Sequence, residues 1–128
     1  MKSDIQSRAD LENIVFTFYQ KLISDQGLSP FFKEIVRENK LAHHLSVVVD
    51  FWEDILFQTH HYQNNTMQKH ENVHQKIPFE KWHFITWLQY LFEAIDEDFQ
   101  GNKALEMKTR ATSIATVMQI KMDLYKTQ

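Results

Sequence analysis

Cysteine is absent from this 128-residue chain, and glycine and proline are scarce, with two residues of each. Without cysteine the chain can form no disulfide, thiolate zinc site, iron–sulfur cluster or cysteine nucleophile. So few turn-forming residues also argue against the many-turned all-β sandwiches and barrels. Long helices are therefore the expected architecture.

A block of basic residues is also lacking. Acidic and basic side chains are scattered along the chain, the net charge is −3 and the pI is about 6.1, so no segment is suited to follow a phosphate backbone. No apolar run approaches the roughly 18 residues of a membrane span, and no basic-then-apolar leader opens the chain. We expect a single domain over residues 1–128, cytoplasmic, a monomer or weak dimer, that binds neither nucleic acid nor membrane.

Apolar residues do recur, and their spacing is that of amphipathic helices. The spacing and its punctuation predict helices at about 8–24, 30–36, 40–59, 66–76, 79–99 and 103–125. Ser29 is the expected N-cap of the second, with Pro30 as its first helical residue. Because nothing indicates a central sheet, the predicted fold class is all-α.

The stretch His70-Glu-Asn-Val-His74 reads as H-E-x-x-H, a zinc-peptidase motif, and Glu93 stands where some such peptidases place a third ligand. A step of 100° per residue puts Glu93 at about 180° from Phe84, which lies on the apolar face of its helix. Glu93 should therefore face solvent. The motif helix is also short and has no strands to pack against, so the peptidase interpretation is disfavoured.

Two E-x-x-H patterns, Glu71 to His74 and Glu80 to His83, imitate the metal-binding motifs of di-iron helix bundles. Such a site requires the two motifs on separate long helices, whereas these lie close together across Pro78. Both are better explained as solvated helix ends. A non-haem di-iron or zinc enzyme that uses His70, His74 and nearby carboxylates stays open as an alternative, as does a metal-free helical interaction module.

Several polar-tipped side chains are predicted to point inward. His44 lies within the apolar face of its helix and His43 on the opposite face. Tyr19 lies at the edge of one apolar stripe and Trp87 on another. In the short helix four residues share one face: Met67, His70, His74 and Ile77. Unsatisfied buried polar groups cost about 1–3 kcal/mol each, so this interior needs a hydrogen-bonded network or a polar guest.

The order and spacing of several short motifs are similar to those of a known family. These motifs are Phe18-Tyr19, Leu28-Ser29-Pro30-Phe31-Phe32, His44-Leu45, Phe51-Trp52, Tyr62 with His70 eight residues on, Trp87-Leu88 with Phe92, and Phe99-x-Gly101. Together they resemble the group III truncated haemoglobins, small globins built as a two-over-two helical sandwich. The resemblance covers residues from about Asp4 to Met122.

This resemblance implies a haem b cofactor, iron protoporphyrin IX, with His70 as the proximal iron ligand. Tyr19, His44 and Trp87 would then line the opposite, distal side of the haem. The apolar neighbours of the haem or its cavity would be Phe32, Val48 and Trp52, together with Met67 and Ile77 from the face of His70. On this interpretation the zinc-like motif is a coincidence around an iron ligand.

The function implied is reversible binding of oxygen and of other small ligands such as NO, CO and cyanide. Tyrosine and indole donors on the distal side would slow the loss of oxygen, because they hydrogen bond to its partly negative outer atom. Several donors around one ligand also suit NO dioxygenase or peroxidase-like chemistry, for which a reductase partner would be needed. The sequence does not rank these uses.

Overall fold

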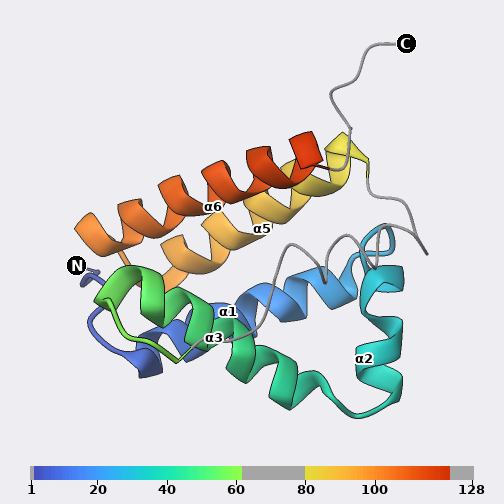
Figure 1. Cartoon of the computed structure of the whole chain (residues 1–128), viewed down its shortest axis with the longest axis horizontal. Helices are drawn as coiled ribbons and strands as arrows, with labels where there is room; N and C mark the ends of the chain where they lie inside the picture. Colours follow the sequence, from blue (N-terminus) through green and yellow to red (C-terminus); the bar gives the residue numbers. More distant parts are fainter. Residues whose placement is uncertain (1, 62–79, 122–128) are drawn as a thin grey trace.

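The structure is a computed structural model that describes residues 2–61 and 80–121, and it is all-α as predicted (Figure 1). In chain order its helices are α1 (Arg8–Ser24), the 3₁₀ turn η1 (Ser29–Phe32), α2 (Lys33–Arg37), α3 (Leu41–Phe57), α5 (Lys81–Asp98) and α6 (Asn102–Lys121). The described residues contain no strand, only one isolated bridge between Ser3 and Phe99. The helix predicted at 66–76 lies outside the described residues.

Helix α1 has its predicted bounds without any difference, and α3 and α5 begin and end within two residues of theirs. Helix α6 begins one residue before its predicted start, and its predicted end at 125 lies outside the described residues. The predicted cap of the second segment is wrong. Leu28, not Ser29, is the N-cap, and no side chain caps this turn. Asp25 organises it instead, because its carbonyl accepts from the Ser29 amide and its carboxylate accepts from the Gly27 amide, both at 2.8 Å.

Helix α1 is the centre of the molecule, because it packs against both α3 and α5, while α6 packs on α5 (Figure 1). Its buried residues recur every three or four positions, as expected for a helix with one apolar face. They are Leu11, Ile14, Val15, Phe18, Tyr19 and Leu22. In α3 the buried residues are Val49, Trp52 and Leu56, and in α5 they include Leu91 and Ile95. The two helix pairs form two layers around this core.

A carboxylate far away in the sequence caps the start of α6. The two oxygens of Asp4 accept hydrogen bonds from the backbone amides of Lys103, at 2.8 Å, and Ala104, at 2.9 Å. Gly101 has a φ of +151°, and a Cβ added there would lie 2.5 Å from the Asp4 side chain. The N-terminal segment is therefore fixed to the turn between α5 and α6.

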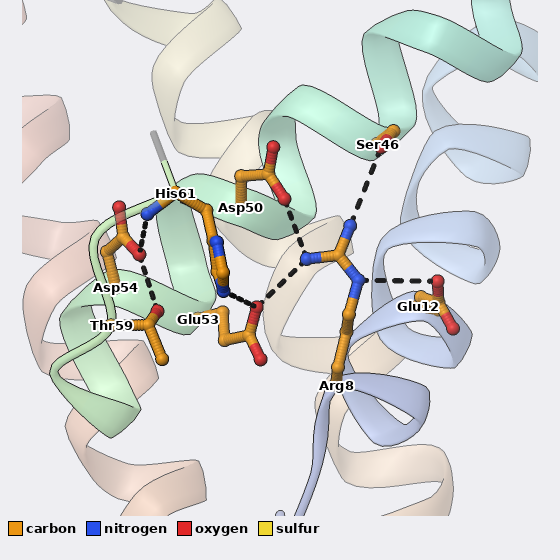
Figure 2. Close-up of polar contacts among 8 residues, drawn as sticks. All are labelled: Arg8, Glu12, Ser46, Asp50, Glu53, Asp54, Thr59 and His61. Atoms are coloured by element: carbon orange, nitrogen blue, oxygen red, sulfur yellow. Dashed lines mark hydrogen bonds and ion pairs between the residues drawn. The ribbon is translucent and has the colours of Figure 1, made fainter. Parts of the chain in front are cut away.

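Arg8, at the start of α1, is held by carboxylates of α3 (Figure 2). Its guanidinium lies 2.7 Å from the Asp50 carboxylate and 2.9 Å from that of Glu53. Glu53 also lies 3.6 Å from the imidazole of His61. These contacts fasten the middle of α3 to the start of α1.

Among residues 2–61 and 80–121, none of the helices combines the length and the apolar character that crossing a membrane requires.

Candidate functional site

Two of the predicted distal residues, Tyr19 of α1 and His44 of α3, are in direct contact. The Tyr19 hydroxyl lies 2.8 Å from Nε2 of His44, and the ring centroids are 5.2 Å apart. Tyr19 is 7% exposed and His44 is half-buried, whereas the neighbouring His43 is exposed. The inward orientation that the helical spacing predicts for His44 is therefore confirmed.

The Tyr19 hydroxyl is held in its protonated form. Burial raises its pKa above the ordinary value of 10, because the interior solvates the phenolate less well than water does. The hydroxyl therefore keeps its proton at physiological pH. It can act as a hydrogen-bond donor or accept one from the imidazole.

Aromatic rings surround this pair. Tyr19 makes edge contacts with Phe32 and Phe18, with ring centroids 5.5 Å and 5.4 Å away, and Phe18 in turn contacts Trp87 at 5.5 Å. Trp87 is partly exposed, and its indole N–H donates no hydrogen bond within the part of the chain that the structure describes. This edge of the site therefore offers an N–H donor that nothing described here uses.

Val48 and Trp52, the two apolar site residues predicted on α3, differ in how deeply they are buried. Val48 follows His44 by one helical turn, so it extends the same face, and it is half-buried. Trp52 is 3% exposed and belongs to the main core, where its ring meets Phe51 edge-on at 5.4 Å. Trp52 thus supports the position of α3 from within the core.

The remaining predicted residues fall in the segment 62–79, outside the described residues. They are Met67, His70, His74 and Ile77, so the proximal assignment of His70 stays a prediction.

The Glu80-x-x-His83 pattern that imitates a di-iron motif has a structural explanation. Nδ1 of His83 accepts a hydrogen bond from the Glu80 amide at 2.8 Å, and the Glu80 side chain accepts from the His83 amide, so the two form a capping box at the start of α5. Burial lowers the pKa of His83 more than Glu80 and Asp25 raise it, which favours the neutral imidazole.

The described residues contain no cluster of histidines and carboxylates that could bind a metal ion. Within 2–61 and 80–121, no three His, Asp or Glu side chains are placed to hold a metal ion. Glu93 is exposed, as its position on the helix predicts.

An open groove that the sequence did not reveal lies beside the Tyr19–His44 pair. It has a volume of about 450 Å³ and separates α1 from the beginning of α3. Its lining consists of Phe16, Tyr19, Gln20, Ile23 and Ser24 from α1 and Leu41 and Leu45 from α3. Helical spacing marked Leu41 and Leu45 only as apolar, because a groove depends on how two helices diverge. Phe18, which joins Tyr19 to Trp87, was also missed as part of the site.

The arrangement matches a known structure. The crystal structure of the group III truncated hemoglobin from Campylobacter jejuni superposes with a TM-score of 0.87 over 100% of both chains, with 22% sequence identity. The chain has the truncated-haemoglobin fold. No protein-family model and no curated protein matches its sequence. The resemblance inferred from short motifs is thus confirmed at the level of the fold. In this truncated-haemoglobin fold, Tyr19 of α1 contacts His44 of α3, and Phe18 links Tyr19 to Trp87 of α5.

Proposed function

We propose that this protein is a haem b-binding truncated haemoglobin that reversibly binds oxygen, NO, CO and cyanide. The observation that carries the proposal is the partly buried contact between Tyr19 and His44, 2.8 Å long and flanked by aromatic rings, in a chain of this fold. Buried polar groups cost free energy unless they are satisfied, and in this contact each group satisfies the other.

The described donor set fits a haem that carries a small ligand. Tyr19, His44 and the indole of Trp87 provide polar groups on one side, while Phe32 and Val48 provide apolar surface for a porphyrin. His70 would hold the iron from the opposite side. When bound, the haem supplies an open coordination position for a diatomic molecule or cyanide.

The chain's own residues then decide how firmly such a ligand is held. Tyr19 keeps its proton because burial raises its pKa, so it can donate to a ligand atom that carries partial negative charge. His44 orients Tyr19: when Nε2 carries the proton, it donates to the tyrosine oxygen and directs the hydroxyl hydrogen away from the imidazole. Only 7% of Tyr19 is exposed, which limits the water that can compete for the hydroxyl.

The decisive experiment concerns His70. His70→Ala should abolish stoichiometric haem binding and the Soret band of the reconstituted protein, since it removes the proposed iron ligand. His74→Ala is the matched control, because it alters a histidine four residues away in the same segment and should leave the spectrum intact. A normal five-coordinate haem spectrum in His70→Ala would contradict the assignment.

The same pair of variants tests the metal-enzyme alternative. A zinc or di-iron protein would contain metal without a Soret band, and both His70→Ala and His74→Ala would reduce the metal content. A helical interaction module would contain neither. Metal analysis and the absorption spectrum of the purified protein therefore separate all three classes.

A further inference from the structure

The cap at the start of α5 has a histidine at the position where glutamate or glutamine is usual. Nδ1 of His83 accepts a hydrogen bond from the Glu80 amide at 2.8 Å, and the Glu80 side chain accepts from the His83 amide. An imidazole nitrogen accepts a hydrogen bond only while it carries no proton. His83 therefore completes the cap as a neutral imidazole and loses this role when Nδ1 is protonated.

The His83 ring is packed against two aromatic side chains. The ring of Trp82 is tilted over it with the centroids 3.9 Å apart, and the ring of Phe31, from η1, meets it edge-on at 4.9 Å. Only 8% of His83 is exposed. A charged imidazole at this place would give up most of its hydration, and it would also lie at the positive end of the α5 dipole. These surroundings favour the neutral ring.

Two carboxylates act on His83, and they come from different elements. Glu80 belongs to the start of α5, and Asp25 is the C-cap of α1. Burial lowers the pKa of His83, and Glu80 and Asp25 raise it by less, so the net pKa lies below the ordinary value of 6.5. Among the described residues, the other elements packed on this end of α5 bring apolar groups, Phe31 from η1 and Met118 from α6. The imidazole therefore gains its second proton only on acidification.

The first turn of α5 is joined to the turn after α1 through residues beside this cap. The Trp82 indole packs against Gly27, since a Cβ added at Gly27 would lie 2.5 Å from the indole ring. The indole N–H donates to the Glu80 carboxylate at 2.6 Å. Further along α5, the Tyr90 hydroxyl donates to the Asp25 carboxylate. The later part of α5 thus has its own attachment to the turn after α1.

We propose that His83 is an acid-sensitive helix cap: protonation of its Nδ1 releases the first turn of α5 from the turn after α1, while the rest of α5 stays in place. The proton removes the acceptor of the Glu80 amide and puts a cation against two aromatic rings. The contribution of the cap to stability is fully present above pH 6.5, declines as the pH falls below that value, and is lost once the pH is below the folded-state pKa. This release does not depend on a bound haem.

Hydrogen exchange of the Glu80 amide measures the cap directly, because that amide is the donor to Nδ1 of His83. In the full-length protein its protection, relative to an unstructured peptide, should fall about tenfold between about pH 7.5 and about pH 5, a change of about 1.4 kcal/mol that lies within the range of helix caps. His83→Gln is the matched variant, because glutamine keeps a side-chain acceptor at this position and does not titrate. It should keep its protection over the same pH range.

His83→Ala removes the acceptor altogether, so protection of the Glu80 amide should be low at every pH. The unmodified protein should therefore behave like His83→Gln at about pH 7.5 and like His83→Ala at about pH 5. Circular dichroism checks that each variant keeps its helices, and if His83→Ala does not fold, the comparison with His83→Gln decides alone. An equal fall in protection in His83→Gln and in the unmodified protein would overturn the proposal.

NMR of the imidazole identifies the group that titrates. Proton–nitrogen correlation spectra should show Nδ1 of His83 without a proton and Nε2 with one at neutral pH, and the titration midpoint should lie below 6.5. The Glu80 amide signal and the Trp82 indole N–H signal should shift with the same midpoint, since both groups belong to the released turn. A proton on Nδ1 at neutral pH, or a Glu80 amide that does not follow the His83 titration, would contradict the assignment.

The extent of the release is tested further along α5. Leu91 is fully buried and follows Tyr90, whose hydroxyl bonds Asp25, so the Leu91 amide should keep its protection at about pH 5. Loss of protection at Leu91 with the midpoint of His83 would mean that all of α5 unfolds, which would refute a release confined to the first turn. These measurements need no Soret band, so their failure and that of the proposed function are distinguishable.

Discussion

The hydroxyl of Tyr19 and Nε2 of His44 lie 2.8 Å apart although the two residues come from different helices. Their contact therefore depends on the crossing of α1 and α3, and on the packing and ion pairs that fix it. Tyr19 lies at the edge of the apolar face of α1 and His44 lies within that of α3, so the polar atoms meet where the two faces join.

Tyr19→Phe should raise the oxygen dissociation rate by about tenfold or more, because a hydrogen bond worth about 1.5 kcal/mol to the bound ligand is lost. Stopped-flow replacement of oxygen by CO measures this rate. Tyr90→Phe is a matched control that removes a hydroxyl bonded to Asp25, remote in sequence from the pair, and should leave the rate unaltered. Equal rates in Tyr19→Phe and the unmodified protein would mean that Tyr19 is not a donor to the ligand.

Trp87→Phe should also raise the oxygen dissociation rate, because it removes the indole N–H while keeping an aromatic ring against Phe18. The expected change is smaller than for Tyr19→Phe, since Trp87 is half-buried and is linked to the Tyr19–His44 pair through Phe18. Trp82→Phe, which changes an exposed indole at the start of α5, is the control. A rate that responds equally to both tryptophan variants would assign the effect to packing.

Asp4→Ala should lower the free energy of unfolding by about 1 kcal/mol at neutral pH, the usual cost of losing a helix cap. Burial raises the pKa of Asp4, but the amides of Lys103, Ala104 and Ile5 lower it by more, so the net pKa lies below 3.8. The charged carboxylate therefore adds stability above about pH 4, and this is lost as pH falls through the folded-state pKa.

Urea unfolding across a pH series measures this effect. The difference between the unmodified protein and Asp4→Ala should shrink below pH 4, the unperturbed range of an aspartate. Asp4→Asn keeps a neutral acceptor at the same place, so it should lose only the pH-dependent part. A constant difference from Asp4→Ala at all pH values would show that the cap does not depend on the charge.

Gly101→Ala should destabilise the protein by about 1–3 kcal/mol, because its φ of +151° is strained for a residue with a side chain. The added Cβ would also approach the Asp4 side chain to 2.5 Å. Thermal unfolding measures the loss of stability. The other glycine, Gly27, offers no matched control, because a Cβ added there would clash with Trp82. Asp4→Ala in the same chain should recover part of the loss if the clash contributes.

Arg8→Leu should lower the unfolding free energy by about 1 kcal/mol, because Asp50 and Glu53 then face each other without the guanidinium. The hydrogen bond to Asp50, and to a lesser extent the one to Glu53, raise the pKa of Arg8. The guanidinium therefore stays charged at all practical pH values. The loss should diminish in high salt, which screens the carboxylates from each other. Arg37→Leu, on the exposed face of α2, should have little effect in the same assay.

The sequence by itself determined the helices, and with them the inward faces of His44 and Tyr19 and the outward face of Glu93. These depend on the repeat of the α-helix, which is local and can be read from spacing. The sequence was less informative about helix caps, since Ser29 was predicted as an N-cap although Asp25 organises that turn. The motifs also led to the correct fold, because their order along the chain reflects the order of the helices.

Only the tertiary structure decided which of the inward groups meet. The 2.8 Å contact of Tyr19 with His44, the capping of α6 by Asp4 and the Arg8 ion pairs join residues from separate segments, and sequence spacing carries no information about helix crossing. The groove has the same origin, because it exists where α1 and α3 diverge. Spacing fixes the face on which a side chain lies, whereas the packing of whole helices fixes its neighbours.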